Sequence, residues 1–278
     1  MMMKKSICFV LAMLLCVFMA ACGGKKTADQ KVETEPVLEE NTTPSVDTTP
    51  ETEPSTTPTT APTTAPTTAP TAPVTEPANT TMTEEAKAFF DNAAFIGDSV
   101  TLKLRNYNTA TGALGSTTFL CQGSYSVAHA VNNTMYLSYQ GQDITPQDAL
   151  AACGAERVFI LLGMNDIALH GIDKTIENWG VLIANIRAKC PDIEIYIQSG
   201  TPIYLGGEKG SLTNENMNKY NNRLEAFANE NGCIYVDVKT SFNNSSGCLA
   251  DAYCSDAYVH FTDAACALWV KLLMKVVK

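Results

Sequence analysis

Five short apolar runs lie in the part of the chain that follows residue 80, at residues 93–96, 117–121, 157–162, 193–198 and 233–238. The third run is a continuous series of β-branched and aromatic residues, which is typical of a strand buried on both faces. Between the runs lie amphipathic stretches with a helical period. Strands that alternate with helices indicate a parallel sheet covered on both sides. We therefore predict an α/β fold, a three-layer α/β/α sandwich around a five-stranded parallel sheet.

The predicted helices have recognisable ends. Thr145 is a capping residue before Pro146, which is favoured at the first helical position, and Gly154 marks the end of that helix. Asp173 caps a long amphipathic segment that reaches residue 189. Further helices are expected at residues 84–91, 100–106, 126–131, 213–231 and 262–277. The glycine-rich residues 204–211 are expected to form a loop.

The N-terminus has the pattern of an export signal. Residues 1–6 are basic, and residues 7–21 form an apolar run that is too short for a comfortable membrane span. The run ends in Met19-Ala20-Ala21-Cys22, which resembles the lipobox of bacterial lipoproteins, with Met19 where leucine is usual. The resemblance implies a signal peptide at residues 1–21, acylation of Cys22, and a protein anchored by lipid to the outer face of the bacterial cell membrane. An ordinary secretory signal is the alternative.

Residues 22–80 differ in composition from the rest of the chain. Between residues 27 and 80 the chain is rich in threonine and proline and has nine acidic residues against one lysine. Such a segment lacks the apolar mass to offset its ordering entropy, so we predict a disordered linker between the membrane and a folded domain at residues 81–278. The formal net charge is −10, and most of it comes from this linker. The domain itself, with 20 acidic and 14 basic residues, is only mildly acidic, which argues against a nucleic-acid partner. We expect the domain to be monomeric.

Cysteine and histidine give few signs of a metal site or a disulfide framework. Of ten cysteines, seven follow Cys22, an odd number. Cys248 and Cys254 lie close enough in the sequence to form a bridge in an oxidising environment. The three histidines are far apart, so no metal site is expected. The other cysteines are expected to be small core residues, at Cys121, Cys153, Cys190, Cys233 and Cys266.

Ser99 follows the first predicted strand directly. A serine at the carboxyl end of such a strand lies at the edge of an open α/β sheet where ligands usually bind. Its N–H also lies at the start of a helix, where it can stabilise negative charge. The structural alternative is an ordinary strand–turn–helix corner in which Ser99 caps the helix.

Four short motifs in order resemble those of one family. Gly97-Asp98-Ser99 follows the first strand, Gly123 the second, and Gly163-x-Asn165-Asp166 the third, and Asp256 and His260 precede the last helix. The chain thus resembles the SGNH, or GDSL, hydrolases. The resemblance implies a flavodoxin-like SGNH hydrolase fold and a serine esterase or acylhydrolase that needs no metal or cofactor.

The chemistry of acyl transfer requires a nucleophile, a base and donors for the oxyanion. Ser99 is the candidate nucleophile and His260 the candidate base, because His260 lies in a loop with acidic residues nearby. His129 and His170 are expected to have structural or substrate-side roles.

The acid that orients His260 is less clearly marked. Asp256 is the first candidate, although the family usually has Asp-x-x-His and this chain has one residue more. Asp251 and Asp263 are the rivals, and a backbone carbonyl is a further alternative.

The resemblance assigns the oxyanion to three donors, which are the Ser99 N–H, the Gly123 N–H and the Asn165 side-chain amide. Glycine lets backbone approach a ligand without a Cβ in the way. The alternatives are a simple turn at Gly123 and an Asx-turn at Asn165. Asp98 and Asp166 are expected to shape loops rather than to act as a pair of catalytic carboxylates as in glycosidases.

These features predict an extracellular serine esterase that hydrolyses O-acyl groups, above all O-acetyl groups, on cell-wall or other carbohydrates. A lysophospholipase or thioesterase, an O-acyltransferase and an inactive glycan-binding module are the alternatives.

Overall fold

The structure is a computed structural model that describes residues 82–277. The predicted signal peptide, Cys22 and the linker up to residue 80 lie outside the described residues and remain predictions. Within the described part of the chain, no helix combines the length and the apolar character needed to span a membrane.

A five-stranded sheet forms the middle layer, and every neighbouring pair of its strands is parallel. The strand order is β2-β1-β5-β6-β7. The five apolar runs of the sequence supply these strands, so the predicted α/β fold is confirmed. The bounds are Ala93–Gly97 (β1), Thr118–Cys121 (β2), Arg157–Leu161 (β5), Glu194–Gln198 (β6) and Ile234–Val236 (β7).

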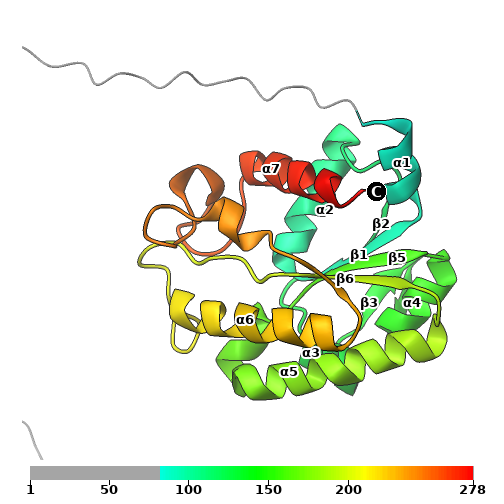
Figure 1. Cartoon of the computed structure of the whole chain (residues 1–278), viewed down its shortest axis with the longest axis horizontal. Coiled ribbons are helices and arrows are strands. Elements are labelled where there is room, and N and C mark those ends of the chain that lie inside the picture. The colour runs from blue at the N-terminus through cyan, green and yellow to red at the C-terminus, as the bar shows by residue number, and fades with distance from the viewer. Residues whose placement is uncertain (1–81, 278) are drawn as a thin grey trace, which may run out of the picture. The chain divides into compact units, whose positions relative to one another are not determined.

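Helices cover both faces of the sheet (Figure 1). Phe90, Leu104 and Trp269 belong to a buried cluster on the face that carries α1, α2 and α7. Trp179 and Leu224 belong to the cluster on the face that carries α3, α4, α5 and α6. The bounds are Glu84–Asp91 (α1), Ser99–Thr111 (α2), Val127–Asn132 (α3), Pro146–Cys153 (α4), Met164–Lys189 (α5), Asn214–Glu230 (α6) and Asp263–Leu273 (α7), with 3₁₀ turns at Lys239–Phe242, Asp251–Tyr253 and Met274–Val276.

Three element ends differ from the prediction. Helix α2 continues to Thr111, where the Thr111 hydroxyl donates to the Tyr107 carbonyl and Gly112 ends the helix in the left-handed region. Strand β7 ends early because the Ser199 hydroxyl accepts from the Val238 and Lys239 N–H groups and turns the chain into a 3₁₀ helix. Helix α7 likewise ends at Leu273 and passes into a 3₁₀ turn.

Two features are absent from the sequence prediction. A hairpin of Leu137–Tyr139 (β3) and Gln142–Ile144 (β4) turns through Gln140 and Gly141, both with positive φ. Its strands are too short to show an alternating pattern. Helix α5 also begins nine residues before the predicted cap, and Gly171, with φ 73° and ψ 172°, divides it into two parts.

Gly163, the residue before α5, is expected to tolerate a side chain poorly. Its φ is 112°, and an added Cβ would overlap the Tyr220 hydroxyl, which is fixed by bonds to Trp179 and Leu162. Gly154 also has positive φ but has no neighbour around an added Cβ. Gly154→Ala should therefore cost only about 1–2 kcal/mol of unfolding free energy from backbone strain, and Gly163→Ala about 1–3 kcal/mol more from overlap. Urea denaturation of both variants measures the difference, and equal losses would contradict the expected contact.

Candidate active site

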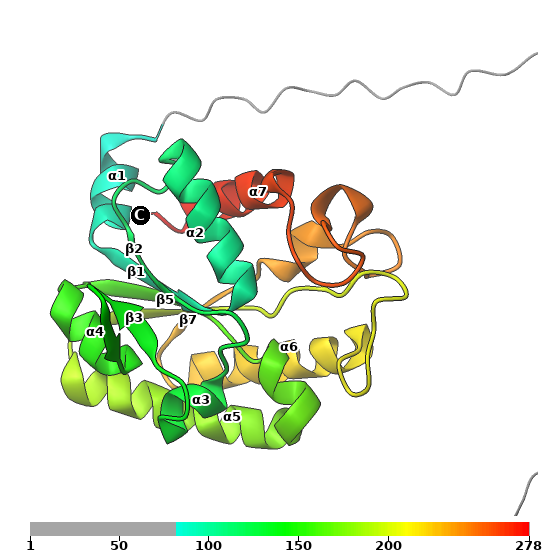
Figure 2. The same ribbon diagram turned by 180° about the vertical axis from the view of Figure 1, so that it is seen from behind.

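The candidate site residues gather at the carboxyl edge of the sheet. Ser99 follows β1, Gly123 follows β2 and Asn165 follows β5, whereas His260 precedes α7. Helices α2 and α7 lie side by side on one face in both views (Figures 1 and 2). The start of α2 is thereby brought to the loop that leads into α7.

Ser99 bonds to His260 and does not cap its helix. The Ser99 Oγ lies 3.0 Å from His260 Nε2. The capping residue of α2 is Asp98, whose Oδ1 accepts from the Val100 N–H at 2.9 Å. The alternative in which Ser99 serves as the helix cap is therefore wrong, because Asp98 fills that position and leaves the Ser99 hydroxyl to the imidazole.

Asp256 reaches His260 despite the extra residue between them. Its Oδ2 lies 2.5 Å from His260 Nδ1. Its Oδ1 accepts from three backbone N–H groups, those of Tyr258, Val259 and His260, at 2.9–3.2 Å. Ala257 has φ 56°, in the left-handed region. This conformation takes up the added residue and folds the carboxylate back over its own turn.

The rival acids face other partners. Asp263 Oδ1 bonds to Lys103 Nζ at 2.6 Å, and Asp251 lies against the Tyr204 hydroxyl. Burial acts to raise the pKa of Asp256, but the hydrogen bonds from His260 and the backbone outweigh it and hold the pKa below its ordinary value. Of the three acids, Asp256 is therefore the one whose carboxylate lies against His260. In that position a carboxylate can hold a proton on Nδ1 and leave a lone pair on Nε2.

The three oxyanion candidates differ in how they are held. Both amide hydrogens of Asn165 have acceptors, since Nδ2 lies 3.0 Å from Asp98 Oδ2 and 3.1 Å from the Tyr125 carbonyl. Gly123 lies in an exposed turn, and an added Cβ there would contact only Leu102 Cδ1, at 3.9 Å. The bond from Gln122 N–H to the Gly97 carbonyl, 3.2 Å, holds that turn beside the strand from which Ser99 follows.

The bond between Asp98 and Asn165 is the part of the site that the sequence reasoning missed. An acid directly before a helix start is a favoured cap, and this signal marks Asp98 as fixed. Asp98 is 1% exposed. Burial raises its pKa to about 6, against the opposing effects of the Val100 N–H and His260.

Folding stability is expected to depend on the ionisation of Asp98. Because its folded pKa of about 6 exceeds the ordinary value of 3.8, the folded state favours the protonated form. The stabilisation is complete below the ordinary pKa and is lost as the pH rises through about 6, a change of about 3 kcal/mol. Asp98→Asn cannot ionise, so its unfolding free energy relative to the parent should rise by about that amount between pH 4 and pH 7. Urea unfolding at both values tests this, and a constant difference would contradict it.

Asp166 shapes the neighbouring loop. Its two carboxylate oxygens accept from the Val127 and Ala128 N–H groups at 2.9 and 2.8 Å. The side chain is fully buried, and burial raises its pKa. Both Asp98 and Asp166 thus use their oxygens to hold backbone or amide groups, in keeping with the loop-shaping roles expected of them.

The remaining histidines do not contact Ser99. His129 lies on α3 beside the Tyr125 ring, with ring centroids 6.2 Å apart, and its Nδ1 is buried without a hydrogen-bond partner. His170 is exposed at the end of the first part of α5. No group of three or more potential metal ligands occurs among residues 82–277.

The seven cysteines in the described part of the chain are free thiols. The bridge that the sequence left open between Cys248 and Cys254 is not formed. Their sulfurs lie next to different groups, Asn214 Nδ2 at 3.5 Å and Asp256 Oδ1 at 3.8 Å. Of the cysteines predicted to be core residues, Cys233 and Cys266 are buried, and the others are half-buried, at Cys121, Cys153 and Cys190.

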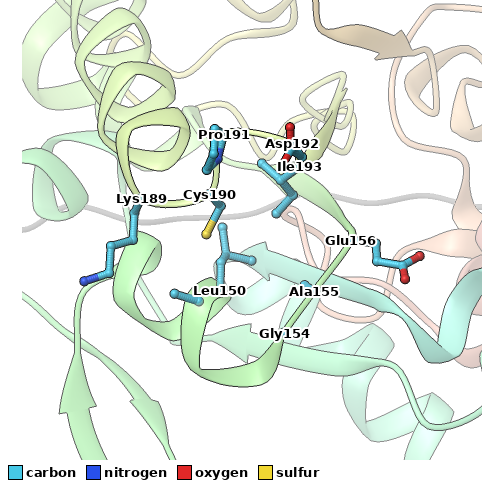
Figure 3. Close-up of a pocket in the computed structure, with 10 residues that line it drawn as sticks. Leu150, Gly154, Ala155, Glu156, Lys189, Cys190, Pro191, Asp192 and Ile193 are labelled. Carbon is cyan, nitrogen blue, oxygen red and sulfur yellow. The ribbon is translucent and has the colours of Figure 1, made fainter.

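A hollow of about 400 Å³ lies elsewhere in the molecule (Figure 3). It is lined by the end of α4, the end of α5 and the residues before β5 and β6, with Cys190 directed towards Leu150. These segments are at the amino ends of the parallel strands. The hollow is therefore at the opposite edge of the sheet from Ser99.

The chain is similar to one protein family and to several solved structures. A model of the GDSL-like Lipase/Acylhydrolase family matches residues 95–268. A comparison of the chain with proteins of curated function found no match.

The similar structures share the fold at low sequence identity. One is a protein from Streptococcus pneumonia assigned as a platelet activating factor, with a TM-score of 0.54, 19% identity, and coverage of 67% of this chain and 84% of its own. A protein assigned as an acylhydrolase from Bacteroides fragilis has a TM-score of 0.53 at 19% identity, with 66% and 85% covered. A GDSL-like lipase from Bacteroides thetaiotaomicron has a TM-score of 0.52 at 17% identity, with 66% and 86% covered.

Proposed function

Because the chain belongs to the GDSL-like lipase/acylhydrolase family of ester-hydrolysing serine hydrolases, we propose that Ser99, His260 and Asp256 are its catalytic triad. The observation that carries this proposal is the continuous chain of hydrogen bonds from Asp256 through His260 to Ser99. The order of roles in that chain is the one acyl transfer requires.

The reaction follows from these contacts. Ser99 Oγ attacks the ester carbonyl while His260 Nε2 takes the hydroxyl proton, and Asp256 stabilises the imidazolium that forms. His260 then gives the proton to the leaving alcohol, which leaves an acyl group on Ser99. A water molecule, deprotonated by the same nitrogen, attacks the acyl-enzyme and releases the acid.

We assign the developing oxyanion to the N–H groups of Ser99 and Gly123 and to the Asn165 amide. The Ser99 N–H is at the start of α2, where the backbone dipoles favour negative charge. The Asn165 amide donates to Asp98 and the Tyr125 carbonyl, so it serves the oxyanion by sharing one of these hydrogens.

Gly123→Ala is expected to lower turnover without lowering stability. An added Cβ has room in the free protein, where it meets only Leu102 Cδ1, but it would obstruct a substrate carbonyl that approaches the Gly123 N–H. We expect kcat/KM to fall by about 10- to 100-fold and the unfolding free energy to change little. Steady-state kinetics and urea unfolding check both parts, and an unchanged kcat/KM would remove Gly123 from the oxyanion site.

We propose that the substrate is a short O-acyl group, above all O-acetyl, on a carbohydrate. The site is open, since the side chains of His260 and Asp256 are 41% and 35% exposed. An open site suits an ester carried on a bulky glycan, whereas a long acyl chain needs an apolar groove to cover it. A linker that reaches from the membrane into a cell wall would bring the domain to such glycans.

Two exposed leucines favour long-chain esters as the second candidate. Leu205, in the loop after β6, is 67% exposed, and Leu169, in the first part of α5, is 75% exposed. Both follow the carboxyl ends of strands and so lie towards the edge of the sheet that holds Ser99. Exposed apolar side chains at that edge can receive an acyl chain, as a lysophospholipase or thioesterase requires.

Substrate preference separates these candidates. Hydrolysis of p-nitrophenyl acetate, octanoate and palmitate should show the highest kcat/KM for acetate, and acetate release from acetylated glycans should exceed fatty-acid release from lysophospholipids. A preference for the longer chains would favour the second candidate. Labelling by a fluorophosphonate probe, with the label mapped to the peptide that contains Ser99, tests the nucleophile itself. An unlabelled protein would contradict the proposed triad.

We also propose that Cys22 carries the lipid anchor and places the domain on the outer face of the membrane. Growth with a radiolabelled fatty acid should label the full chain and leave Cys22→Ser unlabelled. Label retained in that variant would contradict the anchor at this residue.

A further inference from the structure

The loop after β6 lies beside the loop that holds Asp256 and His260 (Figure 1, yellow beside orange). We call residues 204–212 the brace loop and residues 255–260 the acid–base loop. The Tyr204 N–H donates to the Tyr258 carbonyl at 2.8 Å, and Lys209 Nζ lies 4.0 Å from the centroid of the Tyr258 ring. The brace loop thus contacts both the backbone and the side chain of Tyr258, two residues before His260.

Gly207 packs tightly against the acid–base loop. It is buried, and an added Cβ would lie 2.8 Å from the Ala257 carbonyl oxygen and 3.1 Å from Tyr258 Cα. Both are backbone atoms, which cannot rotate away as the end of a flexible side chain can. Gly207 has no positive φ. In a Gly207→Ala variant the strain would therefore come from this contact and not from the backbone conformation of residue 207.

The brace loop is itself held firmly. Asn214, at the start of α6, accepts from the Ile203 N–H at 2.8 Å and donates to the Ile203 carbonyl at 2.9 Å. Its own N–H donates to Glu208 Oε1 at 2.6 Å, and Lys209 and Leu212 exchange two backbone bonds of 3.0 and 3.1 Å. The brace loop therefore connects Tyr258 to the body of the domain through the start of α6.

Most hydrogen bonds of the acid–base loop are internal, and the buried Val259 side chain and the bond to the brace loop are among its contacts with the body of the domain. Asp256 bonds within its turn, and the Ser255 N–H donates to the His260 carbonyl at 2.9 Å. These bonds fix Asp256 relative to His260 but do not fix either of them relative to Ser99. A displacement of about 1 Å at a reacting group can cost on the order of 100-fold in rate.

We propose that the brace loop positions the acid–base loop against Ser99, with Gly207, Lys209 and Tyr258 as positioning residues. The proposal rests on the proposed triad. None of the three is assigned contact with the substrate, so their substitution should lower kcat and leave KM almost unchanged.

Gly207→Ala gives the principal test, with Gly210→Ala as the matched control. Gly210 lies in the same loop, but an added Cβ there has no neighbour within 4 Å, although its φ of 56° brings backbone strain. We expect Gly207→Ala to lower kcat for p-nitrophenyl acetate by about 10- to 100-fold and to slow fluorophosphonate labelling in parallel. Gly210→Ala should lose stability with kcat nearly unchanged. Equal kcat values for the two variants would overturn the proposal.

Lys209 and Tyr258 give a second test that does not depend on a buried glycine. Lys209→Met should lower kcat by about two- to fivefold, as the loss of a cation–π contact allows, Lys209→Arg should restore it, and Tyr258→Leu should match Lys209→Met. A Lys209→Arg variant as slow as Lys209→Met would count against the contact. Failure of the proposed triad is seen separately, in a parent protein that neither hydrolyses esters nor takes the probe at Ser99.

Discussion

Ser99→Ala is expected to lower kcat for ester hydrolysis by about 10⁴- to 10⁶-fold and to abolish fluorophosphonate labelling. The hydroxyl is the only group of this side chain that can form the acyl-enzyme, and it lies 3.0 Å from His260 Nε2, the proposed base. Steady-state hydrolysis of p-nitrophenyl acetate measures the loss. The fold should survive, because the helix cap at this corner is Asp98 and not Ser99.

Ser138→Ala is the control for this experiment. Ser138 is exposed on the β3–β4 hairpin, away from the strand ends that form the site. Its replacement should leave both kcat and labelling unchanged. A Ser99→Ala variant that still turns over substrate near the parent rate would show that another residue is the nucleophile.

Asp256→Ala is expected to lower kcat by about 10³- to 10⁴-fold. Without the carboxylate the imidazole is free to take the wrong tautomer, and the imidazolium formed in the reaction loses the charge that stabilises it. The three backbone N–H groups that Asp256 Oδ1 binds also lose their acceptor, so the turn that carries His260 loosens. Measurement of kcat and KM for p-nitrophenyl acetate tests the expectation.

Asp251→Ala and Asp263→Ala are the matched controls, since each removes an acid near His260 in the sequence that bonds elsewhere. Both should retain kcat within about threefold.

The pKa of Asp256 lies below its ordinary value of 3.8, so this carboxylate stabilises the fold above that pH, and its contribution is lost as the pH falls through the folded pKa. The stability gap between parent and Asp256→Ala should accordingly be larger at pH 7 than at pH 3. If Asp251→Ala shows the large loss of kcat and Asp256→Ala does not, the assignment of the acid is wrong.

The sheet and the positions of the site residues were predictable because both depend on short local patterns. The run at residues 157–162 predicts a buried strand by composition alone, and three of the four motifs follow the end of a predicted strand. The β3–β4 hairpin has no comparable signal, because three-residue strands are too short to show a period. The early start of α5 was missed since Gly171, which divides it, reads as a helix boundary.

The details that align the site depend on contacts between distant segments. Nothing local to Asp98 indicates that its second oxygen meets Asn165, which is 67 residues away. Asp256 could be proposed as the acid, but its geometry depends on Ala257 in a left-handed conformation that alanine seldom adopts. The brace loop was predicted only as a glycine-rich loop, because the role of Gly207 depends on a neighbour about fifty residues further along the chain.

The four-residue spacing of Asp256 and His260 has a consequence for how the triad can vary. Acid and base belong to one small turn with its own internal bonds, whereas the nucleophile belongs to another segment, at the start of α2. The triad therefore consists of two bodies that meet at one contact, the 3.0 Å approach of Ser99 Oγ to His260 Nε2. A shift of one body leaves the acid–base bond intact and changes that single distance. Activity can therefore be adjusted by residues that move one body against the other without contacting Ser99, His260 or Asp256.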